Sequence, residues 1–301
     1  MSPRTAVAAV AVALAAGSGG CARRATPTLP AAALRPPCDA GTYFDGRRCA
    51  PRGDAADRIA RGAALLADFQ VDAALAELEA ARDGGPLAYA DHVRLYEQLG
   101  IAYAYLERDD DALAAFATLL RLDPGHLLSY TLSPRVTFLF ERARRTAGEA
   151  PAIDVQWPRQ LDVARPVPID VEVVADPAGS LARAELYVRE RGTGGFRVVD
   201  VPLESPGRYR RVILPPAGGD RPATLEVYAT ALDARGNEVL VWAGRDRPRE
   251  IPLGYTPPTP WYRKWWVWAV AGTTVAAATG ATVFAITRSP PATLDGDFSL
   301  R

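Results

Sequence analysis

The sequence has little of what most catalytic and metal-binding sites require. Its 301 residues include only two histidines, three cysteines and one methionine. His92 and His126 belong to no metal-binding or nucleophile motif, and the acidic run 109–111 lacks the spacing of a calcium loop. The glycine-rich stretch 192–195 joins two predicted strands and does not precede a helix, so it indicates a hairpin loop rather than a phosphate-binding loop. We therefore predict no catalytic residues, no metal and no cofactor, and a chain that is not an enzyme.

The chain also lacks an excess of either charge. Its 35 basic and 35 acidic residues give a formal net charge of zero, which argues against a nucleic-acid partner. Lys264 is the single lysine, and the abundance of Arg and Ala is typical of a GC-rich genome rather than of an arginine-built site. With 49% hydrophobic and 23% charged residues, the chain is long enough for one to three folded domains.

One long apolar run stands out near the C-terminus. Residues 265–287 contain no ionisable side chain over 23 positions, about 34 Å of helix at a rise of ~1.5 Å per residue. We predict a single transmembrane helix there, with aromatic side chains at its leading end: Trp261, Tyr262, Trp265, Trp266 and Trp268.

The segments around this run complete the predicted C-terminal region. Residues 254–264 form a Pro-rich spacer, in a stretch where prolines recur from Pro248 onward, and residues 288–301 form a short tail. Small residues recur every four positions within the run, which favours close pairing of two helices and a homodimer; they are Gly272, Ala276 and Gly280.

The N-terminus resembles an export signal. Residues 1–20 have a basic start, an apolar stretch too short to span a membrane, and small residues before Cys21. Cys21 resembles the lipidated cysteine of bacterial lipoproteins, although Ser18 stands where that family usually has Leu, so removal by an ordinary signal peptidase is the alternative. Residues 21–53 are predicted to be a flexible tether that contains a turn-rich loop between Cys38 and Cys49.

The cysteine pair bears on the compartment. A disulfide between Cys38 and Cys49 fits an oxidising compartment, and a two-thiol zinc site is the alternative. An exported chain reaches such a compartment. The basic residues that flank the apolar run, in contrast, mildly favour an orientation in which the bulk of the chain is cytoplasmic. We give the export signal more weight, because the charge difference across the run is small.

Residues 54–146 have helical apolar spacing and contain a repeat. The segment 93–124 resembles a tetratricopeptide repeat, a pair of antiparallel helices used for protein binding. The resemblance rests on Tyr96, Leu99, Gly100, Tyr103, Ala112, Phe116 and Pro124. The small residues let the helices approach each other, and the aromatic residues fill the space between them.

A weaker copy of the repeat precedes it. Gly62 and Ala74 keep the 12-residue interval of Gly100 and Ala112, at an offset of 38 residues. A further helix after Ser133 is expected to cap the array. The resemblance implies a groove lined by the first helix of each repeat, with contact residues Arg94, Glu97, Ile101, Ala104 and Tyr105. The alternative is that the apolar members only pack against neighbouring helices.

Past residue 150 the apolar period changes from 3.6 to 2, with turn residues every eight to twelve positions. This pattern predicts a seven-stranded β-sandwich over residues 150–253. The stretch 225–239 is similar to the last hairpin of bacterial immunoglobulin-like or fibronectin type III domains.

The predicted fold is therefore multidomain, α then β, with a short tetratricopeptide-like array, a β-sandwich and one C-terminal transmembrane helix. The predicted function is that of a membrane-anchored scaffold or adaptor of the bacterial cell envelope, with its body in the periplasm and, if Cys21 is lipidated, a second lipid anchor at the N-terminus. Its expected partners are envelope proteins and membrane lipid. The alternative function is a carbohydrate- or peptidoglycan-binding module in which the sandwich is the reader.

Overall fold

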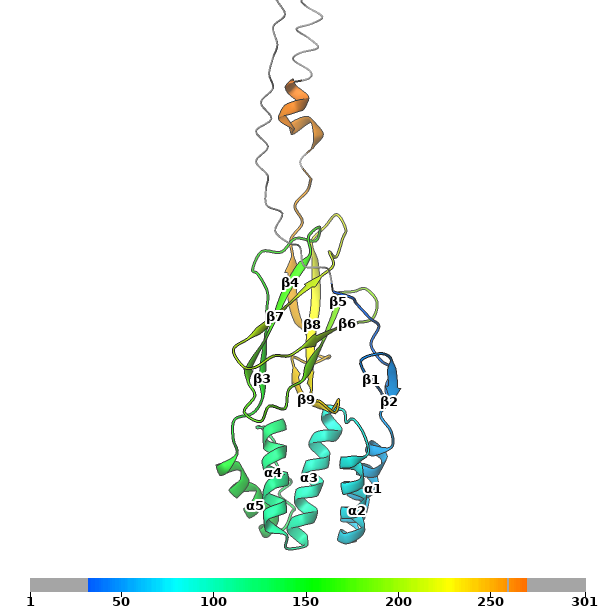
Figure 1. The fold of residues 1–301 in the computed structure, drawn as a ribbon, viewed down its shortest axis with the longest axis vertical. Helices are drawn as coiled ribbons and strands as arrows, with labels where there is room; N and C mark the ends of the chain where they lie inside the picture. Colours follow the sequence, from blue (N-terminus) through cyan, green and yellow to red (C-terminus); the bar gives the residue numbers. More distant parts are fainter. Residues whose placement is uncertain (1–31, 259, 270–301) are drawn as a thin grey trace, which may run out of the picture.

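The computed structural model describes residues 32–258 and 260–269. Figure 1 shows a helical unit at one end, two β-sheets in the middle, and residues 260–269 on the far side of the sheets. A small hairpin of β1 (Thr42–Phe44) and β2 (Cys49–Pro51) lies beside the sheets. The order of elements is therefore β, then α, then β.

Five helices make up the helical unit. They are α1 (Ala55–Ala67), α2 (Val71–Asp83), α3 (Tyr89–Tyr105), α4 (Asp109–Leu122) and α5 (Pro134–Thr146). Each has an apolar face at helical spacing; α1, for example, buries Ala55, Ile59, Gly62 and Leu66. The buried faces meet in one core, with α3 in contact with each of the other four helices.

The two α-hairpins have the same local geometry at an offset of 38 residues. Phe69, after α1, and Glu107, after α3, both have left-handed backbone, with φ of 58° and 60°. The next amide in each turn donates to the matching carbonyl, Gln70 to Leu65 and Arg108 to Tyr103, both at 2.9 Å. These are helix-ending turns of the kind that usually carry glycine.

Glycine is required inside both hairpins. A Cβ on Gly62 would lie 2.7 Å from Leu78, and a Cβ on Gly100 would lie 2.4 Å from the ring of Phe116. Leu78 and Phe116 are themselves 38 residues apart and fully buried. The two helices of each hairpin therefore touch where the first one has no side chain.

Helix α5 runs opposite to the direction that the first helix of a third repeat would have, because successive helices of such an array are antiparallel. At its N-terminal end Arg135 pairs with Asp109, at the start of α4, at 2.7 Å. Near its C-terminal end Arg144 donates to the carbonyl of His126, just past the end of α4, at 2.6 Å. Thus α5 lies parallel to α4, and the loop 123–133 returns along the unit before it.

Eight strands form the two larger sheets. The five-stranded sheet has the order β10-β8-β5-β6, with β9 also paired to β8, and the three-stranded sheet has the order β3-β4-β7. The bounds are β3 (Ala152–Gln156), β4 (Val167–Ala175), β5 (Arg183–Glu190), β6 (Arg197–Pro202), β7 (Tyr209–Leu214), β8 (Ala223–Leu232), β9 (Glu238–Trp242) and β10 (Arg249–Leu253). Residues of both sheets share one apolar core.

The prediction of a seven-stranded sandwich is wrong by one strand. The additional strand, β10, contains Pro252 and follows Pro248, which made it look like a spacer. It pairs antiparallel with β8 at the edge of the sheet, where a proline without an N–H group is tolerated.

Two further predictions are corrected at the ends of the chain. Residues 32–53 are not a free tether, because Ala32 donates to the carbonyl of Ile213 at 2.7 Å and Arg35 pairs with Val198 in a β-bridge. In the parts of the chain that are described, 32–258 and 260–269, no helix is long and apolar enough to cross a membrane. The predicted fold class, which included such a helix over 265–287, is thus not supported. Residues 270–287 lie outside the described residues.

Candidate functional site

The predicted contact residues of α3 do not form a continuous open groove. Ile101 is 5% exposed and Ala104 fully buried, because α3 is the central helix of the unit. This corrects their assignment as contact residues and favours the packing alternative. Arg94 is exposed, while Glu97 and Tyr105 are partly exposed.

The loop 123–133, which returns along the helical unit, covers part of this face of α3. Glu97 lies 3.5 Å from the imidazole of His126 in that loop, and the same ring packs edge-on against Phe140 of α5. The side of α3–α4 on which another repeat would stack is therefore occupied by the chain itself.

An aromatic pair of one exposed and one partly exposed side chain lies at the end of the helical unit away from the sheets. The ring centroids of Phe69 and Tyr105 are 6.4 Å apart, and Phe69 is 77% exposed. Tyr105 ends α3, whose first residue Tyr89 contacts the sheets, so the pair lies about 24 Å from them at ~1.5 Å per residue. Sequence reasoning identified Tyr105 but missed Phe69. The 38-residue offset offered a signal, since it aligns Phe69 with Glu107 in an interhelix turn.

The helical unit and the sheets meet at the hairpin between β8 and β9. The side-chain oxygen of Asn237 accepts from the amide of Leu87 at 2.9 Å, and Glu238 accepts from the amide of Tyr89 at 3.0 Å. Glu238 thereby caps the N-terminus of α3, where a negative charge complements the helix dipole. Asn237 is buried and held by Asp233 through its own amide group at 2.7 Å.

Glu238 also receives contacts from two other directions. Its carboxylate pairs with Arg52, just after the β1–β2 hairpin. Its carbonyl lies 3.0 Å from Nδ1 of His92, and because a carbonyl only accepts, Nδ1 carries the proton. The β1–β2 segment, the helices and the five-stranded sheet thus converge on one residue, which ties the three parts together.

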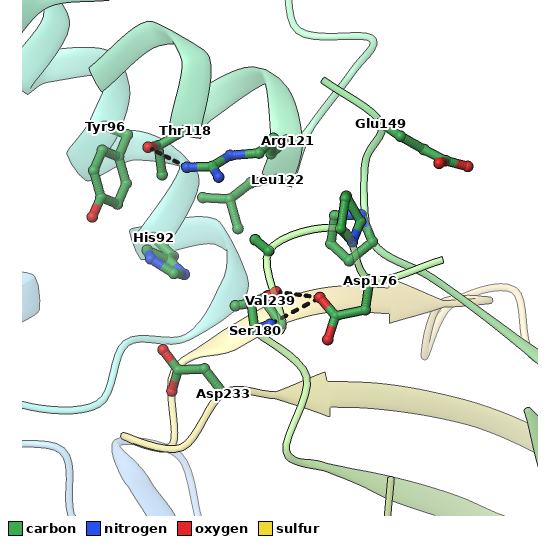
Figure 2. Close-up of a pocket in the computed structure, with 13 residues that line it drawn as sticks. His92, Tyr96, Thr118, Arg121, Leu122, Glu149, Asp176, Ser180, Asp233 and Val239 are labelled. Carbon is green, nitrogen blue, oxygen red and sulfur yellow. Dashed lines mark hydrogen bonds between the residues drawn. The ribbon is translucent and has the colours of Figure 1, made fainter. Parts of the chain in front are cut away.

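A cavity of about 210 Å³ lies beside this junction. Figure 2 shows His92 and Tyr96 of α3 on one side and Asp176 and Ser180 of the sandwich loops on the other. Burial lowers the pKa of His92, so the ring is neutral near pH 7. Asp176 already accepts from the amide and hydroxyl of Ser180, at 2.8 and 3.0 Å. The Asp176 carboxylate is therefore already used in hydrogen bonds within its loop, and His92 in its hydrogen bond to the carbonyl of Glu238.

The remaining predicted sites are placed as follows. Cys38 and Cys49 are joined by a disulfide. Cys21, Gly272, Ala276 and Gly280 lie outside the described residues. Over the described ranges, no group of three or more His, Cys, Asp or Glu side chains is arranged to hold a metal ion.

Comparisons with known proteins add no assignment. No model of a known protein family matches the chain, and no curated protein matches it. The resemblances to tetratricopeptide repeats and to immunoglobulin-like domains therefore stay predictions from the sequence.

Proposed function

We propose that this chain is a non-catalytic adaptor of the bacterial cell envelope that presents the tip of its helical unit to another protein. The observation that supports it is the pair Phe69–Tyr105, in which Phe69 is largely exposed and Tyr105 partly exposed. Exposed aromatic side chains at the end of a rigid element are typical anchors in protein interfaces.

The backbone of Phe69 strengthens this argument. A bulky residue with positive φ is uncommon and costs roughly 1–3 kcal/mol unless the surroundings compensate. Because the ring is largely exposed, packing within the chain offers little compensation. Contact with a partner would give the strained residue a role that glycine does not fill.

The junction at Glu238 fits the same role. An adaptor has to hold its binding surface in a defined position relative to the rest of the molecule. The contacts from Leu87, Tyr89 and Arg52 limit rotation of the helical unit on the sheets. The Cys38–Cys49 disulfide is consistent with an oxidising compartment such as the periplasm.

For the opposite end of the molecule we propose contact with a lipid surface. Five aromatic side chains there are exposed next to Arg263 and Lys264; they are Trp261, Tyr262, Trp265, Trp266 and Trp268. Such rings favour the headgroup region of a bilayer, and the basic pair favours anionic lipid. Anionic vesicles should shift the tryptophan emission of the full chain to shorter wavelength. A shift that persists when Trp261, Trp265, Trp266 and Trp268 are all replaced by alanine would contradict this contact.

The adaptor proposal is tested by Phe69→Gly. Glycine relieves the backbone strain, so the helical unit should become more stable by roughly 1 kcal/mol while partner binding weakens. The assay is crosslinking and pull-down from envelope fractions with the immobilised full chain, followed by titration of the recovered partner. Tyr105→Ala should weaken the same interaction.

The matched control is Glu107→Gly at the equivalent turn. This substitution also places glycine at a position with positive φ, where glycine is not strained. It loses only an exposed ion pair between Glu107 and Arg135, at 3.5 Å. We expect binding equal to that of the unmodified chain. A partner whose affinity is unchanged by Phe69→Gly and Tyr105→Ala, or lowered equally by Glu107→Gly, would remove the aromatic pair from the proposed function.

A further inference from the structure

A second and larger cavity, of about 470 Å³, lies between the five-stranded sheet and the disulfide-closed loop. Its floor includes Tyr187 and Tyr228, neighbours on β5 and β8 whose rings stack at 4.4 Å. One wall is the segment from Cys38 to Phe44, held in place by the disulfide. Its volume lies within the range of about 300–1,000 Å³ that is usual for small-molecule sites.

The two inner carboxylates of this cavity are already occupied by protein donors. Glu185 accepts from Arg35 at 2.9 Å and from the hydroxyl of Tyr187 at 2.6 Å. Glu238 accepts from Arg52 and from the amide of Tyr89. The remaining acidic residue, Asp39, is exposed at the rim, where water and salt screen its charge.

The donors in the same cavity are not all occupied. One terminal nitrogen of Arg52, Nη1, is buried and has no hydrogen-bond partner. Arg245 has no ion pair within the described part of the chain, and its positive charge acts to lower the pKa of the Tyr228 hydroxyl, against the larger effect of burial. Burial raises the pKa of Tyr228 to about 12, so its hydroxyl keeps its proton and remains a donor.

The acceptors of this cavity are used and some of its donors are not, so a ligand that fits it should carry acceptor oxygens and a negative charge. A buried guanidinium N–H without a partner costs free energy, and a rotation of the Arg52 side chain that turns Nη1 toward the cavity would let an incoming oxygen recover it. A carboxylate offers two acceptor oxygens and one negative charge, which suits one or two guanidinium groups. We propose that this cavity binds a small carboxylate-bearing ligand, with Arg52 Nη1, Arg245 and Tyr228 as its donors and the rings of Tyr187 and Phe196 beside the rest of the ligand.

In a cell envelope such a carboxylate has two sources, an acidic sugar or the free end of a short peptide. Titration calorimetry of the full chain with glucuronate, N-acetylalanine and glucose separates them. We expect glucuronate or N-acetylalanine to bind and glucose not to bind, and the tighter of the two acids identifies the source. Failure of both acids to bind at millimolar concentration, or equal binding of glucose, would overturn the proposal.

Variants test whether the named donors are responsible. Arg245→Gln removes an exposed charge with no partner among residues 32–258 and 260–269, so the fold should persist. We expect affinity to fall roughly tenfold or more, as for loss of a charged hydrogen bond. Arg52→Lys keeps a charge near Glu238 but lacks Nη1, and it should weaken binding as well.

The matched control is Arg247→Gln. Arg247 is exposed two positions away and does not line the cavity. Its affinity should equal that of the unmodified chain. An equal loss in Arg245→Gln and Arg247→Gln would show that general surface charge holds the acid and would overturn the assignment of the site. Because the helical tip is not involved, this result is independent of partner binding at Phe69.

Discussion

Substitution of Gly100 by alanine tests the close contact on which the second α-hairpin depends. A Cβ at this position would lie 2.4, 2.5 and 2.8 Å from three atoms of the Phe116 ring. Phe116 is fully buried and packs edge-on against Phe140, with ring centroids 5.4 Å apart. Phe140 therefore hinders movement of the ring, and we expect α3 and α4 to separate.

Two opposing effects set the magnitude. Alanine is favoured over glycine inside a helix by about 1 kcal/mol. Overpacking of a filled core costs about 1–3 kcal/mol and occasionally more. Since a 2.4 Å contact is at the severe end of this range, we expect Gly100→Ala to lower the free energy of unfolding by about 2 kcal/mol.

The assay is urea unfolding followed by far-ultraviolet circular dichroism, read as a shift of midpoint at constant slope. Gly62→Ala is the comparison, because its Cβ would meet the side chain of Leu78 at 2.7 Å, and an aliphatic side chain adjusts more easily than a ring. Gly148→Ala is the control, since no atom lies within 4 Å of its Cβ. A midpoint for Gly100→Ala that equals or exceeds that of the control would refute the close-contact argument.

Three further predictions concern the junction and the disulfide. Glu238→Gln breaks the pair with Arg52 and should reduce stability by roughly 1–2 kcal/mol, measured as faster proteolysis between α2 and α3; unchanged cleavage would contradict the role of Glu238. Reduction of Cys38–Cys49, 11 residues apart, should destabilise the hairpin by about 3 kcal/mol, seen as faster amide exchange in β1 and β2 but not in β8. Burial lowers the pKa of His92, so the unfolded chain takes up this proton first and stability should fall as pH drops through about 6.5. Unfolding curves of His92→Asn should depend less on pH over this window, and an equal dependence would exclude His92 as the cause.

Much of the local structure follows from short-range patterns. The 38-residue offset between Gly62 and Gly100 is reproduced in the contacts to Leu78 and Phe116 and in the two interhelix turns. These features depend on residues within one hairpin. The alternation in β8 similarly places Val227 in the core and Tyr228 on the outer face of its sheet.

The candidate sites were less accessible to sequence reasoning. The repeat pattern predicts Ile101 in a groove, but the exposure of this side chain depends on how α3 is surrounded, and the neighbouring helices bury it. Phe69 was missed because a turn residue carries no periodic signal. The second cavity brings Arg52 and Tyr228 into one lining, although they are far apart in the sequence.

The sequence by itself determined where the five helices and most strands of the sandwich form, and where the helices of each hairpin approach closely at a glycine, because periodicity and close approach within a hairpin involve near neighbours. Only the tertiary structure decided the direction of α5, the docking of residues 32–53 on the sheets and the convergence of contacts on Glu238. These depend on polar groups from distant segments satisfying one another once both are buried, and nothing in the spacing of residues along the chain encodes which pairs will meet.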